Sequence, residues 1–222
     1  MRSSSILSAE RPSFGIPAAD RFSADAEEVR LIGVTMRFAP GREICGQGGR
    51  TDNVYRVISG AVRSFRLLSD GRRQICEFYL PGDIFGIELG AERLATAEAL
   101  AESVLLVARR SALLDGDRPM ASQLWKLAVG ELQRSQDHVL TLGRRSASER
   151  VVSFLIDLAD RLGIREDLEL PMSRQDIADY LGLTIETVSR TLTQLQAAGL
   201  IKVGGCRSIR LRRRAALADL CE

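Results

Sequence analysis

Three neighbouring side chains between residues 186 and 190 have the chemistry to read the edges of DNA bases. Glu186, Ser189 and Arg190 are spaced i, i+3 and i+4, so a helix would place them together on one face. An arginine can donate two hydrogen bonds to guanine, a glutamate can accept one from cytosine, and a serine can donate or accept. The same spacing also suits an ordinary salt bridge between Glu186 and Arg190. The sequence around these residues is needed to choose between base reading and a salt bridge.

Two short amphipathic helices with a turn between them are predicted around these side chains. The apolar positions at helical spacing are Ile177, Ala178 and Leu181 in the first helix and Val188, Leu192 and Leu195 in the second. Gly182 can take the left-handed conformation that ends a helix, and Thr184 can cap the next one. This layout is a helix-turn-helix, in which the start of the second helix meets the bases. We therefore expect Glu186, Ser189 and Arg190 to read bases and Ile185 to make an apolar contact with a thymine methyl group.

Side chains at the starts of these two helices are expected to contact DNA phosphates, because helix N-termini attract anions. They are Ser173, Arg174, Gln175, Thr184 and Thr187. A run of arginines follows the motif and could add phosphate contacts: Arg207, Arg210, Arg212, Arg213 and Arg214. A solvated tail is the alternative interpretation of that run.

A long helix is predicted over residues 119–143, with a seam of apolar and small side chains at alternating steps of three and four. The seam comprises Trp125, Ala128, Leu132, Ser135, Val139 and Leu142. A helix packed on its own domain would show a similar stripe, but a helix-turn-helix usually reads two half-sites as a symmetric dimer. We therefore expect this seam to be a dimer interface. The flanking residues Leu124, Leu127 and Leu140 are expected to face the N-terminal domain.

The N-terminal half shows short apolar runs separated by turn signals, which is typical of a β-sandwich or barrel. The predicted runs cover residues 36–38, 54–58, 61–68, 74–80, 84–86 and 98–107. Asp70-Gly71 is a strong hairpin signal between two of them.

Length and composition are those of a globular protein with two domains. The 222 residues are 45% hydrophobic and 27% charged, with a net charge of +2. Without an apolar stretch long enough to cross a bilayer or an apolar signal core, the chain is expected in the cytoplasm and away from membranes. The four cysteines, Cys45, Cys76, Cys206 and Cys221, lie far apart, and His138 is the single histidine. These residues predict no metal site, and we find no set of catalytic residues, so an enzyme is not expected.

Several segments resemble the CRP/FNR family of transcription regulators. Residues 69–74 and 80–86 look like parts of its jelly-roll sensor domain, and residues 173–195 look like its DNA-binding helices. The pattern Glu186-x-x-Ser189-Arg190 resembles the FNR and FixK branches, in which it reads a TTGA-type half-site of an inverted repeat. Ile185 departs from the arginine of the cyclic-AMP receptor branch. The resemblance implies an activator that contacts RNA polymerase and binds double-stranded DNA as a homodimer.

The sensor region lacks the residues of the usual effectors. Cyclic-nucleotide binders place a hydroxyl beside an arginine for the phosphate, whereas Arg93 has none adjacent and has Glu92, Glu98 and Glu102 nearby. An FNR-type iron–sulfur cluster needs cysteines in the N-terminal arm, and residues 1–44 contain none. This combination is similar to the FixK type, which implies activity without a cofactor. Alternatives are a small effector bound through residues 83–93, a winged helix used as a protein–protein adaptor, and modulation through oxidation of Cys206.

The predicted fold class is α+β, in four parts. They are a flexible arm at residues 1–26, a β-roll at 27–118, a dimerisation helix at 119–143 and a winged helix-turn-helix domain at 144–222.

Overall fold

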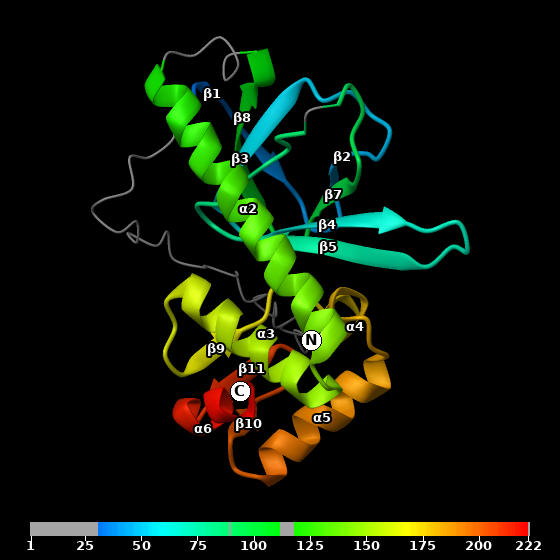
Figure 1. Ribbon diagram of the computed structural model, residues 1–222, viewed down its shortest axis with the longest axis vertical. Helices are drawn as coiled ribbons and strands as arrows, with labels where there is room; N and C mark the ends of the chain where they lie inside the picture. Colours follow the sequence, from blue (N-terminus) through cyan, green and yellow to red (C-terminus); the bar gives the residue numbers. More distant parts are fainter. Residues whose placement is uncertain (1–30, 89, 112–117, 222) are drawn as a thin grey trace, which may run out of the picture.

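The computed structural model describes residues 31–88, 90–111 and 118–221. The expected flexible arm, residues 1–26, lies outside this described part. Two antiparallel sheets form an upper domain, a long helix crosses it, and a smaller helical domain lies below (Figure 1). No helix in the described ranges has the length and apolar character needed to span a membrane.

Eight strands build the upper domain as a β-roll. They are β1 (Gly33–Phe38), β2 (Glu43–Cys45), β3 (Asn53–Ser59), β4 (Val62–Leu67), β5 (Arg73–Tyr79), β6 (Ile84–Phe85), β7 (Thr96–Ala99) and β8 (Ser103–Arg109). One sheet has the order β1-β8-β3-β6 and the other β2-β7-β4-β5. Between the sheets lies an apolar core in which Phe85 stacks on Tyr55 and Tyr79, with ring centroids 4.9 and 4.7 Å apart. The predicted jelly-roll architecture is confirmed.

Two details of the strand prediction were wrong. The run predicted over residues 98–107 is divided into β7 and β8, because the chain turns at residues 100–102, where the backbone N–H of Leu100 donates to Ala61. The three-residue strand β2 was not predicted; it is too short to show an alternating pattern. The Asp70-Gly71 turn does join β4 to β5, with Gly71 at a φ of 81°.

The long helix α2 (Arg118–Arg144) lies along the outer side of the sheet that contains β1 and β8 (Figure 1). Leu124 and Leu127 pack against a small cluster around the buried Val54, as expected for the flank that faces the roll. Leu140 does not follow this expectation, because its side chain is 61% exposed. Helix α2 ends one residue beyond the predicted bound.

The C-terminal domain is a winged helix. Its elements are α3 (Ala147–Leu162), β9 (Asp167–Glu169), α4 (Arg174–Leu181), α5 (Ile185–Ala197), β10 (Ile201–Val203), β11 (Ser208–Leu211), α6 (Arg214–Ala218) and the 3-10 turn η1 (Asp219–Cys221). Strands β10, β11 and β9 form a small antiparallel sheet, of which β10 and β11 make the wing. The apolar core of this domain is continuous with Phe65, Ile75 and Phe78 of the roll. The two domains therefore share buried surface.

Candidate nucleic-acid interface

Helix α4 begins and ends through local signals. Ser173 and Asp176 form a capping box, in which the Ser173 hydroxyl accepts from the Asp176 N–H and the Asp176 carboxylate accepts from the Ser173 N–H. Gly182 ends the helix in the left-handed conformation at a φ of 61°. A side chain at residue 182 would be strained there, so the glycine fixes the turn.

Helix α5 presents the predicted base-reading residues at its start. The Thr184 hydroxyl caps the helix by accepting from the Thr187 N–H at 3.2 Å. The predicted apolar stripe is buried: Val188, Leu192 and Leu195. Ile185, Glu186 and Arg190 are exposed on the same helix, whereas Ser189 is half-buried. No ion pair joins Glu186 to Arg190 in the described part of the chain, so the salt-bridge interpretation does not account for these two side chains.

The predicted phosphate contacts lie around the N-termini of α4 and α5, but several already have hydrogen-bond partners. The Ser173 hydroxyl donates to Asp176 at 2.7 Å, and the Gln175 amide donates to Asp179 at 2.6 Å. The hydroxyls of Thr184 and Thr187 lie 3.0 Å apart.

Arg174 bridges the two helices, since its Nη1 donates to the Ser189 Oγ at 3.4 Å. Arg174 is one of the predicted phosphate contacts, and this hydrogen bond places its guanidinium beside Ser189, one of the predicted base-reading residues.

The arginine run has partners within its own domain. Arg210 forms an ion pair with Asp167 at 2.5 Å, and Arg214 forms one with Asp160. The carbonyl of Pro171 accepts from Arg207 at 3.5 Å. Cys206 is exposed near the end of the wing. These three arginines therefore contact other parts of the winged helix, which neither the phosphate-contact nor the solvated-tail interpretation predicted.

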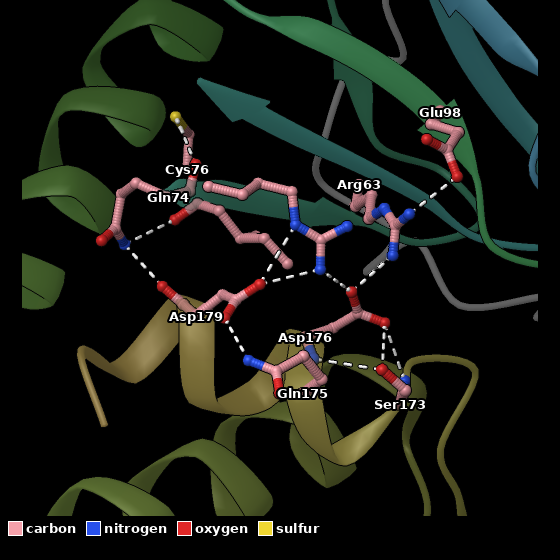
Figure 2. Close-up of polar contacts among 10 residues, drawn as sticks. Arg63, Gln74, Cys76, Glu98, Ser173, Gln175, Asp176 and Asp179 are labelled. Carbon is pink, nitrogen blue, oxygen red and sulfur yellow. Dashed lines mark hydrogen bonds and ion pairs between the residues drawn. The ribbon is translucent and has the colours of Figure 1, made fainter. Parts of the chain in front are cut away.

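A polar cluster holds α4 against the hairpin of β4 and β5 (Figure 2). Asp176 accepts from both Arg63 of β4 and Arg73 of β5, and Arg73 also binds Asp179 at 2.8 Å. Arg63 binds Glu98 on its other side at 2.7 Å. We call these five residues the interdomain ion cluster. No local sequence pattern predicts this cluster, because Arg63 and Asp176 are 113 residues apart.

Burial raises the pKa of Asp176, but the hydrogen bonds from Ser173 and the charges of Arg63 and Arg73 outweigh it and hold the pKa below the ordinary value. Asp176 is thus an ionised, buried carboxylate with partners on both domains.

Arg150 of α3 ties the end of α2 to the turn of the helix-turn-helix. Its guanidinium donates to the backbone carbonyls of Leu142, Arg145 and Leu181, at 2.7, 2.9 and 3.1 Å. These bonds satisfy carbonyls at the ends of two helices, where intrahelical partners are missing. The orientation of α4 and α5 is therefore linked to the last turn of α2.

A second contact between α2 and α4 is aromatic. The ring of His138 stacks on Tyr180, with centroids 4.1 Å apart, and burial lowers the pKa of His138. His138 therefore contributes to the packing of α2 against α4. A cavity of about 320 Å³ opens beside this pair and reaches Glu77 and Arg161. Within the described ranges no three His, Cys, Asp or Glu side chains are grouped as metal ligands.

Arg93, the arginine considered for binding a phosphate in the roll, is already paired within the protein. Arg93 is buried, and its guanidinium donates to the Glu88 carboxylate at 2.8 Å and to the carbonyls of Gly86 and Asn53. Glu88 was not predicted as the partner of Arg93, and Glu98, one of the acids expected near Arg93, binds Arg63 instead. With Leu94 next to Arg93 and no hydroxyl there, these residues do not fit a cyclic nucleotide.

The predicted seam of α2 is exposed except at its C-terminal end. Trp125, Leu132 and Val139 are 72, 58 and 67% exposed, and Ala128 and Ser135 are exposed between them. Leu142, at the end of the seam, is half-buried and lies near Gly182.

Comparison with known proteins assigns both domains. A family model described as a Crp-like helix-turn-helix domain matches residues 149–220, and one described as a cyclic nucleotide-binding domain matches residues 35–115. Together with the geometry of α4 and α5, these matches define a DNA-binding transcription regulator.

The similar proteins narrow this class. The nitrogen fixation regulation protein FixK of Azorhizobium caulinodans is 48% identical over 91% of this chain and 85% of its own length. FixK of Rhizobium meliloti is also 48% identical, over 83% of this chain and 85% of its own. The solved structure of FixK2 from Bradyrhizobium japonicum matches with a TM-score of 0.83 and 45% identity, covering 86% of this chain and 98% of that one.

The chain belongs to the CRP/FNR family of transcription regulators, and its similar proteins within that family include FixK regulators. These relatives are regulators of transcription and not enzymes.

Proposed function

We propose that the protein is a homodimeric transcription activator of the FixK type, which binds an inverted repeat with TTGA-type half-sites and contacts RNA polymerase in the cytoplasm. The observation that carries the proposal is the exposed face of α5, where Glu186 and Arg190 lie beside Ser189 without pairing with each other. Side chains that make no ion pair between them remain available for bases. The N-termini of α4 and α5 add backbone N–H groups and Arg174 for the phosphates.

The dimer is supported by the exposed seam of α2. Large apolar side chains such as Trp125 and Leu132 gain free energy when a second copy covers them. Two copies related by a twofold axis would present two α5 helices, as two half-sites about one helical turn apart require.

Activity without an obligatory cofactor is supported by Arg93. Its ion pair with Glu88 and its bonds to two backbone carbonyls occupy the guanidinium that a phosphate would need. A phosphate-bearing effector bound there would have to displace these partners of Arg93.

The proposal is tested with purified full-length protein and two duplexes, an inverted repeat of TTGA-type half-sites and a shuffled version of equal length. We expect binding to the repeat to be at least about 10³-fold tighter at moderate salt, with both affinities falling as salt rises. Equal binding to both duplexes would contradict base reading and favour the adaptor alternative. Transcription in vitro with RNA polymerase then tests activation.

Native mass spectrometry of the same preparation tests the cofactor. We expect the mass of two chains without an added molecule in a sample that binds the repeat. A retained small molecule whose removal abolishes binding would establish the effector-gated alternative instead.

A further inference from the structure

Ser189 differs from the other predicted base-reading residues because it is held by the neighbouring helix. Glu186 and Arg190 are exposed, whereas Ser189 is half-buried beside the first residue of α4. The Nη1 of Arg174 donates to the Ser189 Oγ at 3.4 Å across the two helices of the motif.

Serine and threonine side chains within helices commonly donate to the carbonyl one turn earlier. Two residues of this domain do so: Ser153 donates to Glu149 at 2.7 Å, and Thr193 donates to Ser189 at 3.0 Å. The Ser189 hydroxyl makes no such bond, and Arg174 is its one hydrogen-bond partner among the described residues. Its proton therefore has no acceptor in this part of the chain.

A serine hydroxyl carries one proton and two lone pairs, whereas a guanidinium can only donate. When Arg174 donates to the Ser189 Oγ, it occupies a lone pair and leaves the proton to point elsewhere. In the proposed function, on which this inference rests, the DNA supplies the acceptor that this proton lacks within the described residues.

We propose that Arg174 is a positioning residue that fixes Ser189 as a hydrogen-bond donor toward DNA. Ser189 then selects a base edge that carries an acceptor, such as thymine O4 or a purine N7, and rejects an amino group at the same place. A free serine would tolerate both kinds of edge.

This assignment completes a defined pattern on α5. Glu186 can only accept when ionised and Arg190 can only donate, so Ser189 is the one ambiguous member of the face. Arg174 removes the ambiguity. Because the Arg174 guanidinium has further N–H groups, it can bind a DNA phosphate at the same time. One residue would then both contact the DNA backbone and orient Ser189 toward one base pair.

The experiment compares full-length variants on a set of duplexes in which each position of the selected half-site is varied in turn. The variants are Arg174→Ala, Ser189→Ala, the double variant, Arg190→Ala as a reference for base reading, and Gln175→Ala as a control. Gln175 adjoins Arg174 on α4 and bonds Asp179, not Ser189. Alanine is a good helix former at each of these positions, and thermal unfolding checks that each variant is folded.

We expect Ser189→Ala to lose about fivefold preference at one base pair, as one hydrogen bond predicts. Arg174→Ala should lose a similar preference at the same pair, in addition to binding every duplex more weakly. The double variant should show no less preference at that pair than Ser189→Ala alone. Gln175→Ala should weaken binding to all duplexes without changing any preference.

Uniform weakening by Arg174→Ala, with the preference at the Ser189 base pair intact, would reduce Arg174 to a phosphate contact and overturn the positioning role. A wild-type protein that prefers no duplex would overturn the proposed function as well. If Ser189→Ala keeps every preference while Arg190→Ala loses one, the inference fails but base reading by α5 stands.

Discussion

Arg190 is exposed near the start of α5, where no carboxylate of its own helix pairs with it. We predict that Arg190→Ala costs about 1–3 kcal/mol of binding free energy on the selected repeat and relaxes the preference at one base pair. The reason is the loss of a bidentate pair to a base edge. Titration of repeat and shuffled duplexes measures both quantities.

A matched control separates base reading from loss of positive charge. Arg66 is also exposed but lies on β4 of the roll, so Arg66→Ala removes the same charge away from the proposed DNA surface. We expect its affinity for both duplexes to match that of the wild type. Equal losses by Arg190→Ala on both duplexes would show that Arg190 contacts phosphate only.

Single residues could be predicted where their signal is local. The turn at Gly182 and the Thr184 cap follow from rules on neighbouring backbone, and both were confirmed. The partner of Arg93 was missed, although Glu88 lies five residues away, because the sequence does not tell which of several nearby acids folds inward.

Between elements, the interdomain ion cluster joins α4 to β4 and β5. We predict that Asp176→Asn destabilises the protein by roughly 2–3 kcal/mol, somewhat below the usual cost of breaking a buried pair, because Arg63 keeps Glu98 and Arg73 keeps Asp179. Urea unfolding measures the change.

The control for this variant is Asp160→Asn. Asp160 also binds an arginine, Arg214, but both side chains are more than one third exposed. Its loss should cost less than about 1 kcal/mol. Similar losses for the two variants would mean that the interdomain ion cluster is no stronger than a surface pair.

The lowered pKa of Asp176 also predicts how this stability depends on pH. A carboxylate whose pKa is lower in the folded than in the unfolded state stabilises the fold above the unfolded value, about 4, and loses that effect as pH falls through the folded value. The stability difference between wild type and Asp176→Asn should therefore stay constant at neutral pH and shrink below about pH 4. Urea titrations from pH 3 to 7 measure it, and a difference that grows on acidification would be inconsistent with an ionised Asp176.

Elements with strong local periodicity were predicted, and contacts between them were not. The helices α4 and α5 carry their caps and apolar stripes within a few residues. Strand β2 has three residues and a shifted register with β7, so no alternation marks it. The bonds from Arg150 to Leu142 and Leu181 depend on how three helices meet, which no spacing along the chain specifies.

At the scale of the whole molecule, the seam of α2 determines the proposed dimer. We predict that Leu132→Glu converts the dimer to a monomer and lowers affinity for the repeat by more than tenfold, because a buried charge at the seam is costly and one α5 reads one half-site. Sedimentation velocity and duplex titration measure the two effects.

Leu140 provides the control within the same helix. It is about as exposed as Leu132, at 61 against 58%, but lies outside the predicted seam. Leu140→Glu should remain dimeric and bind normally. A monomeric Leu140→Glu variant with a dimeric Leu132→Glu would place the interface on another face of α2.

Asp176 makes the winged helix dependent on the roll of its own chain. Its carboxylate caps α4, one of the two helices proposed to contact DNA, and its compensating charges, Arg63 and Arg73, come from the roll. A winged helix cut out of this chain would carry Asp176 and Asp179 without those arginines, next to a polyanion. A chimera that joins this winged helix to another sensor domain would therefore need arginines at the positions of Arg63 and Arg73. Among related proteins, we expect changes at these two positions to accompany changes at Asp176 and Asp179.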